Sequence, residues 1–94
     1  MPVFTVTKII DGDTFEVSPQ WKWSGQTGTR VRPAGYDAPE LPSGKGNKAK
    51  AELTVLIEDE QVELREAYKV DHGRLVCDVF FQGKNLTDYF PEFE

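Results

Sequence analysis

The segment VFTVTKIIDGDTFEV, residues 3–17, decides the fold of this chain. Val3 to Ile10 is rich in β-branched residues, which predicts a β-strand. Asp11-Gly12 is a turn pair that tolerates a positive φ, so a tight hairpin into a second strand over Thr14–Val17 is expected. The first fifteen or so residues after the start therefore predict a protein built around a sheet.

Shorter elements follow this hairpin. The stretch Ser18–Gly28 contains Pro, Ser, two Gly and two Trp, and it is interpreted as a loop or a hairpin tip. Pro33 cannot donate to a sheet, so it ends a short strand over Thr29–Arg32. Alternation of apolar residues predicts two further strands, at Gln61–Arg65 and Arg74–Phe81. A single helical turn is expected at Asn85–Phe90, after a turn in the chain.

One segment has the period of a helix. Between Asn47 and Ile57 the apolar residues recur at i, i+4, i+7 and i+8, on one helical face: Ala49, Leu53, Leu56 and Ile57. Asn47 is expected to cap the start of this helix. Prolines and glycines should keep the preceding stretch, Asp37–Gly46, irregular.

These elements predict a mainly β fold with one helix, an α+β arrangement. Five short strands with the helix between the third and the fourth is the order of a five-stranded Greek-key OB barrel. Ferredoxin-like and other small α+β folds use similar elements, so the order alone leaves them open. A chain of 94 residues is expected to form a single domain, residues 1–94, around one modest core.

The composition excludes several classes. A hydrophobic fraction of 38% with 12% aromatic residues fits a folded globule, and no stretch approaches the ~20 apolar residues of a membrane span. The first residues show no basic start followed by an apolar core, so no signal peptide is visible in this chain and no compartment follows. Cys77 is the single cysteine, which rules out an internal disulfide, and one Cys with one His cannot build a zinc site. Cys77 alternates with Leu75 and Val79 and is expected in the core.

The charge is acidic and unevenly distributed. The formal net charge is −5, with a net +2 over residues 1–50 and −7 over residues 51–94. An acidic chain is a poor candidate for tight binding of nucleic acid by bulk electrostatics. A transient enzyme with a small basic cleft is compatible with this charge distribution.

Three motifs carry the chemistry: Ile10-Asp11-Gly12-Asp13-Thr14, Arg32-Pro33-Ala34-Gly35-Tyr36-Asp37-Ala38-Pro39-Glu40 and Asp71-His72-Gly73-Arg74. They supply carboxylates and two arginines. Carboxylate oxygens hold hard cations such as Ca²⁺, and guanidinium groups grip phosphate oxygens in pairs. The inventory suits a divalent cation and a phosphodiester. Asp11 is interpreted as a turn residue, whereas a second Asp at position 13 is more than a turn needs.

The three motifs, in this order, resemble the staphylococcal nuclease (thermonuclease) family. The resemblance extends roughly from Thr5 to Tyr89, except for the loop Ser18–Gly28, and includes the tail Gly83-Lys84-Asn85-Leu86. It implies an OB barrel with the helix in the predicted place. It also implies a Ca²⁺-dependent nuclease that acts on single-stranded or loosened DNA or RNA.

The resemblance also implies roles for individual residues. Asp13 and Asp37 become the carboxylate ligands of Ca²⁺, and the backbone carbonyl of Ala38 the third protein ligand. Glu40 becomes the general base for the attacking water, although it could orient the water without taking its proton, or be an ordinary loop residue. Arg32 and Arg74 become the catalytic arginines that contact the scissile phosphate.

The sequence departs from the family at two places near the expected site. Family members often have Lys and Tyr before this Gly-Arg, where Asp71 and His72 stand here; His72 could stack on or hydrogen-bond the nucleotide, and a surface position is the plainer interpretation. Trp21 and Trp23 point the same way if their segment is extended, so with Lys22 they could stack on bases. A place for both rings in the core is favoured, because large aromatic side chains are usually buried.

Family members usually continue with further helices, whereas this sequence ends at Pro91-Glu92-Phe93-Glu94. A short member or a trimmed domain is expected, and the exposed barrel surface makes a homodimer conceivable. The alternative function is a catalytically silent OB module that binds nucleic acid or a protein partner. A silent module has no need of all five side chains, and all five are present: Asp13, Arg32, Asp37, Glu40 and Arg74.

Overall fold

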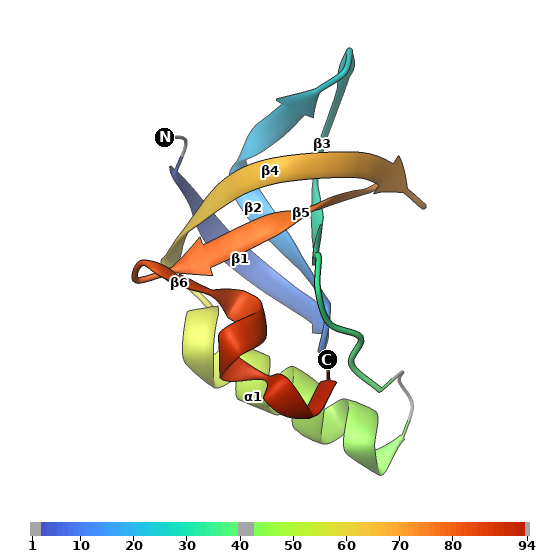
Figure 1. Ribbon diagram of the computed structural model, residues 1–94, viewed down its shortest axis with the longest axis vertical. Helices are drawn as coiled ribbons and strands as arrows, with labels where there is room; N and C mark the ends of the chain where they lie inside the picture. Colours follow the sequence, from blue (N-terminus) through green and yellow to red (C-terminus); the bar gives the residue numbers. More distant parts are fainter. Residues whose placement is uncertain (1–2, 40–42, 94) are drawn as a thin grey trace.

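The computed structural model describes residues 3–39 and 43–93. Its elements lie in the order β1 (Val3–Asp11), β2 (Thr14–Trp23), β3 (Gln26–Pro33), α1 (Gly44–Ile57), β4 (Gln61–Asp71), β5 (Arg74–Phe81) and β6 (Lys84–Asn85). Two short 3₁₀ helices, η1 (Leu86–Tyr89) and η2 (Pro91–Phe93), complete the order. Figure 1 shows the strands curling into a barrel, with α1 and the two 3₁₀ helices gathered at one end.

The sheet closes into a barrel through a parallel pair of strands. Its order is β3-β2-β1-β4-β5, with the two-residue β6 added beside β5, and β3 also pairs with β5. That closing pair is parallel, from Arg30 opposite Arg74 to Pro33 opposite Cys77, whereas the other pairs are antiparallel. The five-stranded mixed OB barrel with its helix after the third strand confirms the expected fold.

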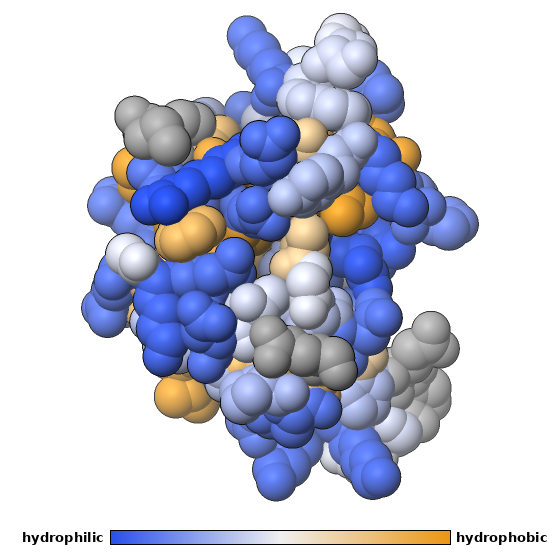
Figure 2. All heavy atoms as spheres, viewed as in Figure 1, coloured by the Kyte–Doolittle hydropathy of each residue, from blue (hydrophilic) through white to orange (hydrophobic). Residues whose placement is uncertain are grey.

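The core lies inside the barrel and under α1. Residues that alternate along the strands point inward and are almost fully buried, among them Val6, Phe15, Val31, Cys77 and Val79. Helix α1 covers the end of the barrel with three residues of its predicted apolar face, Ala49, Leu53 and Ile57, while Leu56 is only partly buried. The face in Figure 2 is mostly hydrophilic, with scattered apolar patches.

Of the two structures expected for residues 18–28, a loop or a hairpin tip, the hairpin is correct, and its two strands form an arm of the sheet. Strands β2 and β3 run on to Trp23 and Gln26, and the arm projects beyond the barrel in Figure 1. The turn uses Ser24 and Gly25, whose φ values of 51° and 78° are both positive, as a two-residue hairpin requires. The strands are longer than the expected Thr14–Val17 and Thr29–Arg32, because residues that favour loops take part in the pairing.

Trp21 anchors this arm in the core. The residue is 2% exposed, and its Nε1–H donates to the Arg30 carbonyl at 2.8 Å. A Cβ at Gly28 would lie 2.7 Å from the Trp21 ring, so the ring packs closely against the opposite strand. Trp21 therefore has the core position that the sequence favoured, and its buried ring is not available to stack on a base.

Helix α1 begins three residues before the expected start. Its N-cap is Ser43, whose side chain accepts the Gly46 N–H at 2.8 Å, so Asn47 is not the cap. The glycines that favoured an irregular stretch lie in the first helical turn, where the Ser43 cap outweighs their low helix propensity.

Strand β4 is longer than predicted, reaching Asp71 rather than Arg65. It pairs with β5 through two register shifts, between Leu64 and Ala67 and between Ala67 and Lys69, which break the simple alternation. A two-residue turn, His72-Gly73 with φ values of 52° and 75°, then leads directly into Arg74. No helix among the described residues is long and apolar enough to cross a membrane.

Candidate functional site

The turn between β1 and β2 builds one side of the candidate site. Asp11 ends β1, and its Oδ1 accepts the backbone N–H of Asp13 at 3.0 Å, as in an Asx turn. Asp11 therefore has the turn role that was expected from the sequence. The same hydrogen bond holds Asp13 at the tip of the hairpin, where its side chain is 15% exposed.

Gly12 brings this turn against the helix and the loop after β3. A Cβ at Gly12 would lie 2.6 Å from the Ala49 Cβ and 2.7 Å from the Ala38 Cβ. Contacts below 3.0 Å are essentially absent between real Cβ atoms. Lack of space, rather than the positive φ expected from the Asp-Gly pair, is thus the reason for a glycine here.

The loop after β3 is fastened to the turn by two hydrogen bonds. The Tyr36 hydroxyl donates to the Gly12 carbonyl at 3.1 Å, and Asp13 Oδ2 accepts the Ala38 N–H at 3.3 Å. A third bond ties the loop to the C-terminal part of the chain, since the Asp37 N–H donates to the Phe93 carbonyl at 2.9 Å. Burial, followed by the negative charges of Asp13 and Asp11, raises the pKa of the Tyr36 hydroxyl, which stays a donor.

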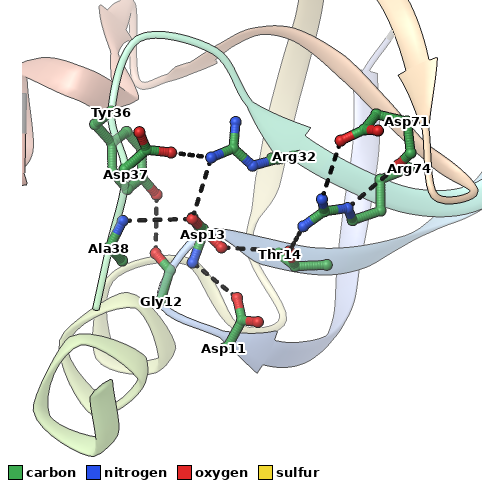
Figure 3. Close-up of polar contacts among 10 residues, drawn as sticks. All are labelled: Asp11, Gly12, Asp13, Thr14, Arg32, Tyr36, Asp37, Ala38, Asp71 and Arg74. Carbon is green, nitrogen blue, oxygen red and sulfur yellow. Dashed lines mark hydrogen bonds and ion pairs between the residues drawn. The ribbon is translucent and has the colours of Figure 1, made fainter. Parts of the chain in front are cut away.

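Arg32 joins the two carboxylates. Its Nη2 forms an ion pair with Asp13 Oδ2 at 3.5 Å and contacts Asp37 Oδ1 as well (Figure 3). The Arg32 side chain is 23% exposed, whereas that of Asp37 is 80% exposed. Two carboxylates from separate chain segments thus converge on one positive group at the surface.

Asp13 lies in an environment that disfavours its charge. Burial, together with the hydrogen bond and negative charge of Asp11, raises the pKa of the Asp13 carboxyl from 3.8 to about 6, against the opposing effects of Arg32 and the Ala38 N–H. A carboxylate held in this way gains from an added positive charge. The local field therefore favours a cation at this place.

Arg74 completes the site from β5. Its guanidinium donates from Nη1 to Thr14 Oγ1 at 3.1 Å, from Nε to the Asp71 carbonyl at 3.3 Å and from Nη2 to Asp71 Oδ2 at 3.3 Å. In the parallel register Arg74 lies opposite Arg30, two positions from Arg32, while Val31 and Leu75 between them point into the core. Arg32 and Arg74 therefore share the outer face of the barrel.

Asp71 and His72 lie at the rim of this face. His72 Nδ1 is 3.0 Å from Asp71 Oδ1, and its side chain is 83% exposed. Burial alone would raise the pKa of Asp71, but the hydrogen bond and charge of His72, with Lys69 and Arg74, lower it overall. The exposed position of His72 agrees with the plainer interpretation of a surface residue, and its role toward a substrate stays a prediction.

The sequence-predicted residues thus fall into three groups. The structure brings together Asp13, Arg32, Asp37, Ala38 and Arg74. Glu40 lies outside the described residues. Trp21 and Trp23 lie in the hairpin arm; Trp23 is partly buried and packs against the core, so its stacking role stays a prediction.

Two residues with a place in this site were not singled out from the sequence. Tyr36 is 4% exposed and Thr14 is 2% exposed, and each makes a hydrogen bond to a remote segment, 24 and 60 positions away. Both stand inside the quoted motifs. That position is the signal that could have found them, because a polar side chain buried beside a motif must have partners.

The oxygen donors of the candidate site suit a hard metal ion. Within residues 3–39 and 43–93, no group of three or more His, Cys, Asp or Glu side chains is arranged to hold one. Asp13 and Asp37 nevertheless converge on a single cationic group, and their donors are oxygens, as Ca²⁺ prefers. The donor chemistry fits a hard cation that takes its remaining ligands from backbone and water.

Comparison with known proteins finds a distant relative. No protein-family model matches the chain. The chain is 33% identical over 82 residues to a protein of Haemophilus influenzae named as an uncharacterized endonuclease. The aligned region covers 87% of this chain and 44% of that protein, so the chain spans less than half the length of this relative. The chain is accordingly a distant homologue of a protein named as an endonuclease.

Proposed function

We propose that this protein is a Ca²⁺-dependent nuclease that hydrolyses phosphodiester bonds of DNA or RNA in single-stranded or loosened strands. The observation that carries the proposal is the convergence of Asp13, Asp37 and Arg32 on the face that also holds Arg74. The homologue named as an endonuclease and the resemblance of three motifs to the thermonuclease family support it.

In this proposal the two arginines bind the scissile phosphate. A guanidinium group offers paired N–H donors that match two phosphate oxygens, and lysine would supply only a point charge. The transition state gathers negative charge on the phosphoryl oxygens, so donors fixed in advance stabilise it more than the substrate. Arg74 is held by hydrogen bonds to Thr14 and Asp71, and it also neutralises the departing oxygen.

Asp13, Asp37 and the Ala38 carbonyl hold Ca²⁺ in this proposal. When bound, the ion supplies positive charge that polarises the phosphoryl group and acidifies a water molecule. The Asp13 carboxyl, which burial and Asp11 disfavour as an anion, gains a counter-ion. Arg32 pairs with both carboxylates in the structure. With Ca²⁺ neutralising them, its guanidinium would be available to donate to the phosphate.

Glu40 acts on the attacking water in the same scheme. It stands three positions after Asp37 in the motif, and this position is the support for its role. A carboxylate beside the water can accept its proton or orient it for attack in line with the leaving oxygen.

Digestion of heat-denatured DNA and of RNA, with Ca²⁺ or with a chelator, tests the proposal. Cleavage should require Ca²⁺ and should fall by roughly 100-fold or more in Arg74→Ala and in Glu40→Gln. Arg30→Ala is the matched control, because Arg30 stands on the same face but is 53% exposed and paired with Glu16 at 3.4 Å. This variant should cleave almost as fast as the wild type.

Circular dichroism confirms that each variant is folded before its rate is measured. A folded wild-type protein that cleaves neither substrate at high concentration would refute the proposed nuclease activity. A silent OB module that binds nucleic acid or a protein would then be the better account of the fold.

A further inference from the structure

Thr14 lies between the two halves of the candidate site. It is the first residue of β2, directly after the turn, and it is 2% exposed. A buried hydroxyl group needs hydrogen-bond partners. Its Oγ1 accepts from Arg74 Nη1 at 3.1 Å and lies 3.4 Å from Asp13 Oδ1, to which the hydroxyl donates (Figure 3).

The hydrogen bonds of Arg74 leave a useful pair of donors. A guanidinium has five N–H groups. Those on Nε and Nη2 reach Asp71, and one on Nη1 reaches Thr14. One N–H on each Nη makes no hydrogen bond to a described residue. Such a pair can bind two oxygens of one phosphate.

The two residues that hold Arg74 differ in burial. Asp71 is at the rim, with a side chain 38% exposed that also contacts His72. Thr14 is fully enclosed by the barrel, with its χ1 angle restricted by its β-branched side chain. The hydroxyl of Thr14 is therefore the rigid one of the two, and it is the one that touches the carboxylate side of the site.

We propose that Thr14 is a positioning residue of the nuclease site, whose buried hydroxyl fixes the Arg74 guanidinium relative to the Asp13 carboxylate. The inference rests on the proposed function, because it assigns Arg74 to the phosphate and Asp13 to the cation. One hydroxyl then sets the spacing between the two charges that act on the same phosphodiester. A small misplacement of such groups costs a large part of the rate.

Two substitutions separate the hydroxyl from the shape of the side chain. Thr14→Val keeps the branched shape and removes the hydroxyl, and Thr14→Ser keeps the hydroxyl. On denatured DNA with Ca²⁺, Thr14→Val should lower kcat by roughly 10- to 100-fold with a smaller change in KM. Thr14→Ser should retain most of the activity. Thr54→Val is the control, because its hydroxyl donates to the Lys50 carbonyl within α1, at 2.7 Å, away from the candidate site.

A double-mutant cycle tests the same link without catalysis. The free energies of unfolding of Thr14→Val, Arg74→Gln and the double variant are measured in chelator by urea denaturation. The double variant should lose less stability than the two single losses together, because both remove one hydrogen bond. Thr14→Ala replaces Thr14→Val in all comparisons if the latter does not fold.

The outcomes distinguish the inference from the proposed function. Additive losses in the cycle, a fully active Thr14→Val, or a Thr14→Ser as slow as Thr14→Val would each overturn the role of the hydroxyl. A wild-type protein without cleavage would refute the proposed function and the catalytic role together. The cycle would then decide alone whether Thr14 holds Arg74.

Discussion

Replacing Gly12 by Ala tests how the fold positions the site. The new methyl group would lie 2.6 Å from the Ala49 Cβ and 2.7 Å from the Ala38 Cβ. Carbon atoms in good contact are about 3.5–4.0 Å apart, so the turn must retreat by about 1 Å from α1 or from the loop. Neither Ala49 nor Ala38 has a flexible side chain that could move aside.

The cost follows from these contacts. Overpacking of this kind costs about 1–3 kcal/mol of stability. The lower entropy of the unfolded chain returns about 0.4–1 kcal/mol of it. The expected net loss is therefore about 1–2 kcal/mol, which lowers Tm by roughly 5–15 °C in a domain of this size. Displacement of Asp13 and Ala38 should also lower the cleavage rate by roughly 10- to 100-fold.

Calorimetry and the cleavage assay measure the two effects on the same samples. Gly44→Ala is the matched control, because nothing lies within 4 Å of a Cβ built there. It should be neutral or slightly stabilising, since Ala favours a helix more than Gly does. A Gly12→Ala protein with the Tm and the cleavage rate of the wild type would refute the close packing of turn, helix and loop.

Three further changes have outcomes set by the structure. Burial raises the pKa of the Asp13 carboxyl from 3.8 to about 6, so the contribution of this group to stability is greatest below pH 3.8 and is lost as the pH rises through about 6. In chelator, the free energy of unfolding of Asp13→Asn should therefore exceed that of the wild type by about 1–3 kcal/mol between pH 4 and 7. Urea denaturation that shows no such difference would contradict the raised pKa. Tyr36→Phe leaves the Gly12 carbonyl without its donor and should lower Tm, at a cost of about 1–3 kcal/mol; an unchanged Tm would count against that bond. Trp21→Phe removes the hydrogen bond to the Arg30 carbonyl and should lower stability by about 1–3 kcal/mol without changing the affinity for a labelled oligonucleotide; weaker binding at full stability would restore a stacking role.

The barrel could be predicted because its signals are local. The β-branched residues of Val3–Ile10, the turn pair Asp11-Gly12 and the apolar face of Asn47–Ile57 each lie within one segment. A hairpin tip at residues 18–28 was one of two expectations, but the length of its strands could not be predicted, because its Pro, Ser and Gly residues favour loops and the packing of Trp21 against Gly28 arises only once two strands pair.

For the candidate site, the charged residues could be predicted from the sequence, but the hydrogen bonds that support them could not. Its charged members stand in recognisable motifs, and four of them converge as expected: Asp13, Arg32, Asp37 and Arg74. The supporting bonds were missed because they join distant segments, from Tyr36 to Gly12 and from Arg74 to Thr14. A pattern along the chain does not give such distances. The Ca²⁺ requirement stays a prediction.

The ratio of the cleavage rates of Arg30→Ala and Arg74→Ala on heat-denatured DNA with Ca²⁺ is the most direct test of the central claim. The two arginines face each other across the parallel strands, and only Arg74 is fixed by Thr14 and Asp71 beside the carboxylates. The account predicts a ratio of roughly 100 or more in favour of Arg30→Ala, with no cleavage in chelator. Equal rates in the two folded variants, or cleavage that persists in chelator, would contradict it.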